Sequence, residues 1–112
     1  MTKPEIQYED FAKLDIRVGQ IKDVEEIEGA DKLWKLIVNL GEEIGERTIC
    51  AGIKEFYSKE ELINKKIGVI VNLAPRKMRG VESQGMLLAS SDKEHAKVKL
   101  AELKGEPGWI IS

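Results

Sequence analysis

The sequence has 112 residues, of which 42% are apolar and 34% are charged, and its formal net charge at pH 7 is -2. This length and composition predict one globular domain spanning residues 1–112, and they exclude a second full domain and a disordered chain. The single cysteine, Cys50, excludes an intrachain disulfide. Because no segment reaches the roughly 20 apolar residues of a membrane span and no secretory leader is visible, we expect a cytoplasmic protein.

The first predicted strand begins at Leu14, where apolar and polar residues alternate strictly as far as Val18. The next apolar residues, Ile21 and Val24, are out of phase with this alternation. Glycine inside a strand often marks a bulge, so Gly19 is the predicted site of the bulge that absorbs the shift. A long first strand bent in this way can serve two faces of a small barrel.

Two further strands are predicted at residues 33–40 and 47–51, with the turn-rich segment GEEIGE between them. In the first of the two, Trp34 shares a face with the apolar residues Leu36, Val38 and Leu40. This phase favours a position in the core for Trp34 over a role in base stacking.

A short helix is predicted after these three strands, because Ser58 and Glu61 have the spacing of a capping box. Residues 67–73 and 86–89 then predict a fourth and a fifth strand. Three strands, a short helix and two more strands, with a bent first strand, form the order of an OB-fold. We therefore predict an all-β, five-stranded OB-fold barrel over about residues 12–90.

A basic loop separates the last two predicted strands and contains Arg76, Lys77 and Arg79. Between residues 62 and 81 the sequence has five basic residues and no acidic one, so all 20 acidic residues lie elsewhere. In this barrel the loop lies at a mouth, where long cationic side chains can reach a phosphate backbone. The pattern predicts a phosphate-bearing partner.

A C-terminal extension of about residues 91–112 follows the barrel and ends in Trp109, Ile110 and Ile111. An apolar tail of this kind covers either the edge of its own barrel or a second copy of the protein. We favour the second copy, which predicts a homodimer formed through the extension.

Four blocks of the sequence resemble the tRNA-binding domain family, and they occur in the family's order and spacing. The blocks are FAKLDIRVGQI (11–21), GADKLWKLIVNLG (29–41), AG (51–52) and NLAPRKMRGVESQGMLLAS (72–90). The sequence is most similar to the small homodimeric tRNA-binding proteins and to the separate or C-terminal part of methionyl-tRNA synthetases. The resemblance implies an OB-fold that binds tRNA without catalysis, cofactor or metal, dimerises through its tail and has methionyl-tRNA synthetase as a possible partner.

The resemblance also adds five positions to the RNA-binding face that Arg76, Lys77 and Arg79 would form; these are Arg17, Lys32, Asn72, Ser83 and Met86. Other roles remain open for four of them. Arg17 could hold a salt bridge, and the Asn72 amide could order the loop. Ser83 could cap the loop, and Met86 could pack in the core.

The sequence has two residues each of Trp, Tyr and Phe, mostly at apolar-phase positions or near the ends. Few aromatic side chains are therefore left for base stacking, which favours recognition of tRNA by shape and phosphate over base reading. An alternative function is that of a dimeric protein-binding chaperone with the same fold, because the segments GEEIGE and YSKEELI are similar to that family.

Overall fold

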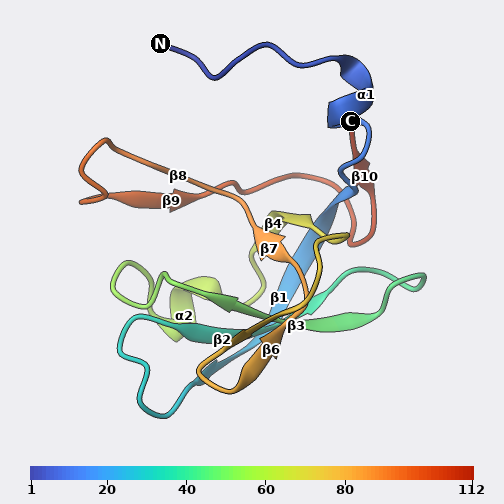
Figure 1. The fold of residues 1–112 in the computed structure, drawn as a ribbon. Coiled ribbons are helices and arrows are strands. Elements are labelled where there is room, and N and C mark those ends of the chain that lie inside the picture. Colours follow the sequence, from blue (N-terminus) through green and yellow to red (C-terminus); the bar gives the residue numbers. More distant parts are fainter.

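The computed structural model describes residues 1–112. It contains two one-turn helices and ten strands, and most of the chain between β1 and β7 forms a barrel (Figure 1). The elements are α1 (Tyr8–Phe11), β1 (Ile16–Glu26), β2 (Trp34–Asn39), β3 (Glu46–Ala51), α2 (Lys59–Leu62), β4 (Lys66–Ile70), β5 (Arg76–Met78), β6 (Val81–Ser83), β7 (Met86–Leu87), β8 (Ala89–Ser91), β9 (Val98–Leu100) and β10 (Ile110–Ile111).

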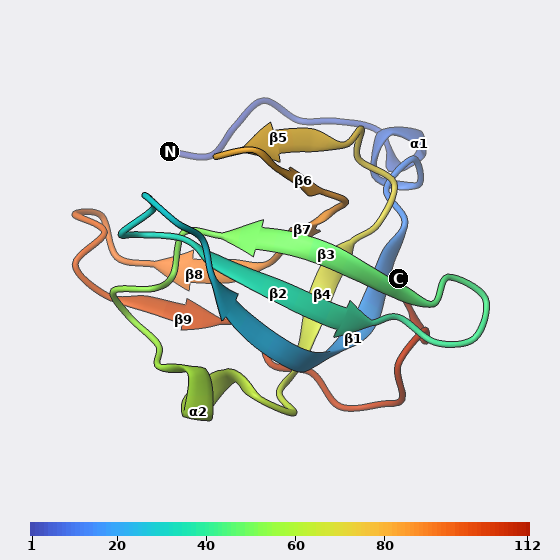
Figure 2. The ribbon, with the colours of Figure 1, turned by 90° about the horizontal axis from the view of Figure 1, so that it is seen from below.

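The barrel consists of five antiparallel strands in the spatial order β3-β2-β1-β4-β7. The two edges of the sheet, at β3 and next to β7, are joined by two hydrogen bonds. The N–H of Gln84 donates to the carbonyl of Thr48 at 2.8 Å, and the N–H of Cys50 donates to Ser83 Oγ at 3.0 Å. The ring is therefore nearly closed, with the β5–β6 hairpin standing beside β3 (Figure 2). The predicted all-β OB-fold barrel is confirmed.

The bulge of β1 does not lie at Gly19, where the sequence predicts it. The register with β2 shifts between Ile21 and Asp23. At Gly19 a Cβ would lie 2.6 Å from Val38 Cγ1 and 2.9 Å from Leu40 Cδ2, so close packing across the barrel excludes any side chain there. The sequence pattern does not separate these two uses of glycine, because both depend on the missing Cβ.

The barrel interior is a cluster of buried side chains from β1 to β4, α2 and β9, and Leu87 of β7 packs against it. Trp34 belongs to this core, as predicted; it is 7% exposed, and its Nε1 donates to the carbonyl of Tyr57 at 2.8 Å. The cluster consists of Ile21, Val24, Trp34, Leu36, Val38, Leu40, Ile49, Ala51, Ile53, Leu62, Ile67, Val69, Val71 and Leu100.

The short helix α2 begins as the sequence predicts, with Ser58 as its N-cap. Ser58 Oγ accepts from the N–H of Glu61, and the Glu61 carboxylate accepts from the N–H of Ser58 at 2.9 Å. Hydrogen bonds from the backbone and the side chain of Ser58 lower the pKa of Glu61, because they favour the charged carboxylate. The helix buries Leu62 in the barrel core.

The chain after β7 packs back onto the barrel. The fifth predicted strand divides into β7 and β8, and β8 forms a projecting hairpin with β9 (Figure 1). Leu100, at the end of β9, joins the barrel core, and Glu102 bridges to Ile67 in β4. Finally, β10 pairs with the start of β1 through Ile16 and Ile111. The tail therefore covers one edge of its own barrel.

Large apolar side chains remain exposed at the end of the barrel where β1 begins and β10 ends. Trp109 is 61% exposed and Ile110 is 68% exposed, although the backbone of this segment is hydrogen-bonded to β1. The N-terminal segment with α1 lies at the same end (Figure 1). It adds five more exposed side chains: Met1, Ile6, Tyr8, Phe11 and Leu14.

No helix of the structure has both the length and the apolar character that crossing a membrane requires.

Candidate functional site

The basic segment after β4 is an ordered hairpin, whereas the sequence analysis predicts a loop there. β5 and β6 pair with Arg76 opposite Ser83 and Lys77 opposite Glu82. The two turn residues, Arg79 and Gly80, have φ angles of 52° and 82°. Two successive positive φ values are typical of a type I′ turn, which matches the right-handed twist of a hairpin. The sequence hides this turn, because arginine is not a residue that normally indicates it.

The two faces of the hairpin differ in what they contact. Met78 and Val81 pack against a small cluster formed by Ile27, Ala30 and Cys50, which joins the hairpin to β3 and to the β1–β2 loop. Burial raises the pKa of the Cys50 thiol, so Cys50 is a neutral packing residue at pH 7. The hairpin is thus fixed on one face and leaves the other face free.

Lys77 lies on the free face, directly opposite Glu82. Cross-strand neighbours share a face and interact. The acid that ends the basic run therefore lies beside its central lysine, so the hairpin is less strongly positive than the sequence order suggests.

The tip of the hairpin meets the β1–β2 loop. Arg79 and Lys32 line a shared cavity of about 220 Å³, together with Asp31 and the backbone of Gly29. The structure therefore brings together two of the predicted site residues that are far apart in the sequence. The β1–β2 loop and the loop after β4 are the two loops that an OB-fold uses for oligonucleotides.

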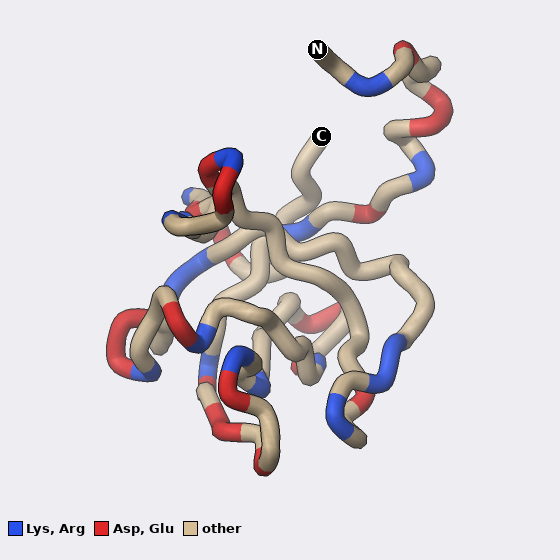
Figure 3. The backbone as a smooth tube through the Cα atoms, turned by 60° about the vertical axis from the view of Figure 1, so that its left-hand side comes forward, with Lys and Arg blue, Asp and Glu red and all other residues tan.

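The basic stretch at residues 62–81 does not form one patch. Lys65 pairs with Glu102 at 3.2 Å, and Lys66 lies 4.0 Å from Glu106, so both lysines hold the C-terminal tail to the barrel. No ion pair engages the basic side chains of the hairpin. Basic and acidic segments alternate over much of the tube, whereas the hairpin has a run of basic residues (Figure 3). The hairpin therefore has three basic residues without an ion pair within four positions of the chain.

An apolar groove of about 310 Å³ opens between the hairpin, the segment after β4 and the end of β3. Met86, which is 48% exposed, and Leu73, which is 42% exposed, form part of its wall. Arg76 lines the same groove. Met86 is thus not a core residue, and the structure brings it next to one of the hairpin cations. The sequence analysis missed the groove and the part that Leu73 takes in it, because both depend on how the hairpin folds over β3.

Ser83 lies at the base of the hairpin and is only 4% exposed. Its Oγ accepts from the N–H of Cys50 at 3.0 Å and donates to the carbonyl of Gly85 at 3.3 Å. Ser83 therefore bonds the hairpin to β3, which favours the structural alternative for this residue.

Asn72 lies where β4 leads toward the hairpin. Its amide oxygen accepts from the N–H of Asp15 at 2.8 Å, and its amide nitrogen donates to the carbonyl of Lys13 at 2.7 Å. Both ends of the amide thus hold the segment that precedes β1. The geometry favours the ordering role of Asn72 over a direct contact.

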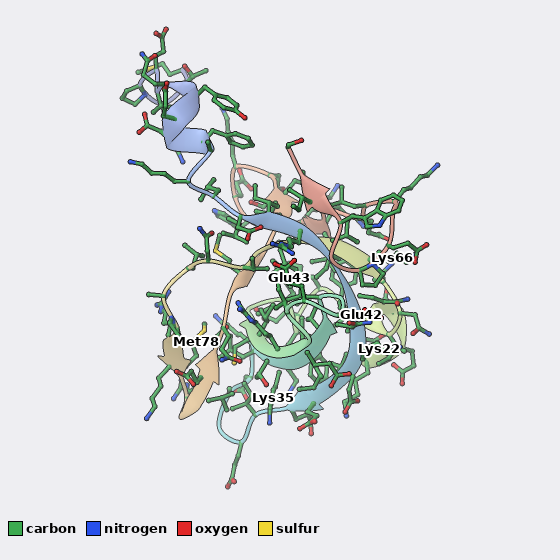
Figure 4. The ribbon with its side chains drawn as sticks, turned by 90° about the vertical axis from the view of Figure 1, so that its right-hand side faces the viewer. Lys22, Lys35, Glu42, Glu43, Lys66 and Met78 are labelled. Atoms are coloured by element: carbon green, nitrogen blue, oxygen red, sulfur yellow. The ribbon has the colours of Figure 1, made fainter.

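Arg17 is nearly buried, and its guanidinium is engaged on both sides. Nε lies 2.9 Å from a carboxylate oxygen of Asp15, and Nη1 lies 3.3 Å from Glu43 in the β2–β3 loop. Figure 4 shows Glu43, an ion-pair partner of Arg17, apart from Met78 of the hairpin. The structure separates Arg17 from the hairpin cations.

These features define an OB-fold domain with a basic hairpin and an apolar groove at one mouth of its barrel. The family model described as "Putative tRNA binding domain" matches residues 16–108. The sequence is 53% identical over 90 residues to a methionine--tRNA ligase of Pyrococcus horikoshii, and 52% identical over 107 residues to that of Caldanaerobacter subterraneus. These matches cover 80% and 96% of the chain, but only 12% and 16% of the two ligases.

Two solved structures cover almost the whole chain. A MetRS related protein from Pyrococcus horikoshii has a TM-score of 0.90 at 38% identity, and the match covers 98% of this chain and 100% of that one. The CsaA chaperone protein from Picrophilus torridus has a TM-score of 0.87 at 40% identity, with 96% and 100% covered. The chain belongs to the tRNA-binding domain family.

Proposed function

We propose that this chain is a non-catalytic tRNA-binding protein that recognises tRNA by its shape and phosphate backbone. The observation that carries the proposal is the set of unpaired cations on the ordered hairpin, Arg76, Lys77 and Arg79, in a member of this family. Lys32 extends the set across the barrel mouth. Cations spread over two loops suit a curved phosphate backbone, which they bind with little dependence on sequence.

The proposed setting is the cytoplasm, and the proposed partner is a methionyl-tRNA synthetase. The curated relatives are whole ligases of this kind, in which the similar segment is a small part. We propose that the present chain supplies tRNA binding to such an enzyme, as its beta subunit or as a partner acting in trans. We further propose a homodimer, so that two hairpins engage one tRNA.

Binding to tRNA is tested by fluorescence anisotropy at low salt. Wild-type protein binds, and its affinity falls with salt at a log–log slope of roughly -0.7 to -0.9 for each phosphate contact. The combined substitution of Arg76, Lys77 and Arg79 by Ala reduces the affinity by at least tenfold and lowers the magnitude of the slope by about three contacts.

A matched control removes three other exposed and unpaired cations, with Lys93, Lys97 and Lys104 changed to Ala. This variant has the same net charge as the hairpin variant, and it keeps most of the affinity. Equal losses in the two variants would show a general charge effect and contradict the hairpin site. Absence of binding by wild-type protein would reject the proposed function.

Binding of unfolded protein is the second candidate function, because two chaperone structures named CsaA have this fold at 40% and 28% identity. The apolar groove is compatible with that role. An aggregation assay with a denatured client separates the two candidates: suppression of aggregation without any affinity for tRNA would reverse our preference.

A further inference from the structure

The groove beside the hairpin is small, apolar and open to solvent. Its volume of about 310 Å³ is at the lower limit of ligand pockets, which are roughly 300–1,000 Å³. A cavity of this size fits one flat ring system, and it is too small for a helix or a folded segment. We infer that the groove takes one unpaired nucleobase of the bound RNA while Arg76 holds the adjacent phosphate. This inference rests on the proposed function.

The walls of the groove suit a flat apolar face. Met78 lies in the hairpin, Met86 lies in β7, and Leu73 lies in the segment after β4. Methionine is unbranched and adapts to irregular shapes, so two methionines can close on rings of different outline. The groove would therefore accept a base without selecting its identity, which agrees with recognition of tRNA by shape.

The floor of the groove allows close approach to the backbone of β3. Gly52 follows β3 and lines the groove. A Cβ at Gly52 would have only the carbonyl of Lys32 near it, at 4.0 Å, so the space above this backbone is open. Glycine lets a ligand approach the main chain closely, and a base can then lie against the peptide group.

The charge around the groove favours a nucleotide over an apolar peptide. Arg76 is the only charged residue in the lining, and no acidic residue belongs to it. Lys77 and Arg79 lie next along the same hairpin, and neither forms an ion pair. A nucleotide supplies both a ring for the apolar wall and a phosphate for Arg76, whereas an apolar peptide leaves the cations without partners.

The test uses two RNA stem-loops of identical sequence that differ only in the position of a fluorescent adenine analogue, 2-aminopurine. One RNA has the analogue in the unpaired loop, and the other has it in the stem. Binding of the protein changes the fluorescence of the loop analogue, because its base leaves the RNA stack and enters the groove. The stem analogue keeps its signal.

A groove-filling substitution, Ala74→Leu, tests the position of the base. Ala74 is exposed and lines the groove, so a larger apolar side chain occupies the space without altering charge or core. We expect this variant to bind the loop RNA roughly tenfold more weakly, as loss of one stacked base predicts, and to lose the fluorescence change. The control is Ala96→Leu, an equal change at an exposed residue of the β8–β9 turn, which behaves as wild type.

The outcomes separate this inference from the proposed function. If Ala74→Leu binds and responds as wild type while the triple hairpin variant fails to bind, the groove holds no base and tRNA binding by phosphate contacts stands. If wild-type protein binds neither stem-loop nor tRNA, the proposed function itself is wrong. If an unfolded apolar peptide binds in an Ala74-dependent manner and RNA does not, the groove serves protein clients and the inference is overturned.

Discussion

Arg17 and Arg76 are both cationic, but their surroundings give them different roles. The hydrogen bonds that Arg17 donates to Asp15 and to Glu43 raise its pKa, so its charge is permanent and already satisfied within the protein. Arg76 is exposed and has no ion-pair partner. A phosphate would have to displace two carboxylates from Arg17, whereas it meets no competitor at Arg76.

We therefore predict opposite effects for two single substitutions. Arg17→Ala lowers the free energy of unfolding by roughly 1–2 kcal/mol, because the four hydrogen bonds to the Asp15 and Glu43 carboxylates are lost while Glu43 stays largely hydrated. It changes tRNA affinity little. Arg76→Ala weakens tRNA binding and leaves stability unchanged. Urea denaturation and anisotropy on both variants check this pair; a large affinity loss in a fully folded Arg17→Ala protein would contradict it.

At the scale of elements, the hairpin is expected to bind through its shape as well as its charge. Gly80 has a φ of 82°, and a Cβ there would meet no atom within 4 Å. A side chain at this position strains only the backbone. Gly80→Val therefore disfavours the turn by about 1 kcal/mol or more, without removing a charge or a core contact.

We predict that Gly80→Val weakens tRNA binding and increases amide hydrogen exchange in β5 and β6. Gly45 provides a matched control, since it has a φ of 80° and equally open space in the β2–β3 loop. Gly45→Val carries a similar backbone cost and keeps the affinity. If Gly80→Val binds as tightly as wild type, the cations work without the ordered hairpin.

The bounds of the barrel strands could be predicted from the sequence to within about three residues, and the hairpin could not. β2 shows the period-two burial that a sheet with one wet face produces, and α2 shows its capping residues. By contrast, β1 is buried on both faces from Ile16 to Gly19, where Asp15 and Glu43 engage Arg17 and the returning tail pairs along its edge. A contact with a distant segment leaves no local pattern, and the same holds for β10 and for the groove.

The candidate site also has features that the sequence predicts and features that only the fold reveals. The hairpin cations follow from composition alone, since they are the basic residues of an acid-free stretch. The position of Lys32 and Arg79 beside one cavity depends on the topology of the barrel, as do the ion pairs of Lys65 and Lys66 with the tail. Lys65 and Lys66 are close to the hairpin in the sequence because β4, which separates them from it, has only five residues.

At the scale of the whole molecule, the exposed apolar end of the barrel has two contributors. The sequence analysis considered only the C-terminal extension, and the structure adds the N-terminal segment with α1, whose Tyr8 is 74% exposed. Ile110 is also exposed, yet its backbone pairs with Arg17 in β1. Apolar side chains held on a paired strand form an ordered surface that suits a symmetric contact with a second copy.

We predict that wild-type protein is a dimer at micromolar concentration and that Ile110→Asp is a monomer. The substitution adds a charge at the proposed contact and leaves the packing of Trp109 on Gly105 intact. Sedimentation equilibrium measures the mass. Ile63→Asp is the control, because Ile63 is an exposed apolar residue next to α2, at another part of the barrel, and this variant stays dimeric.

The monomer also tests whether two hairpins act together on one tRNA. A second linked contact raises apparent affinity by roughly 10²–10⁴-fold when the geometry allows both to engage. Ile110→Asp then binds tRNA at least tenfold more weakly than wild type, although every residue of its own hairpin and groove is unchanged. Equal affinity in monomer and dimer would show that one barrel holds the complete site, and that the exposed end serves another partner.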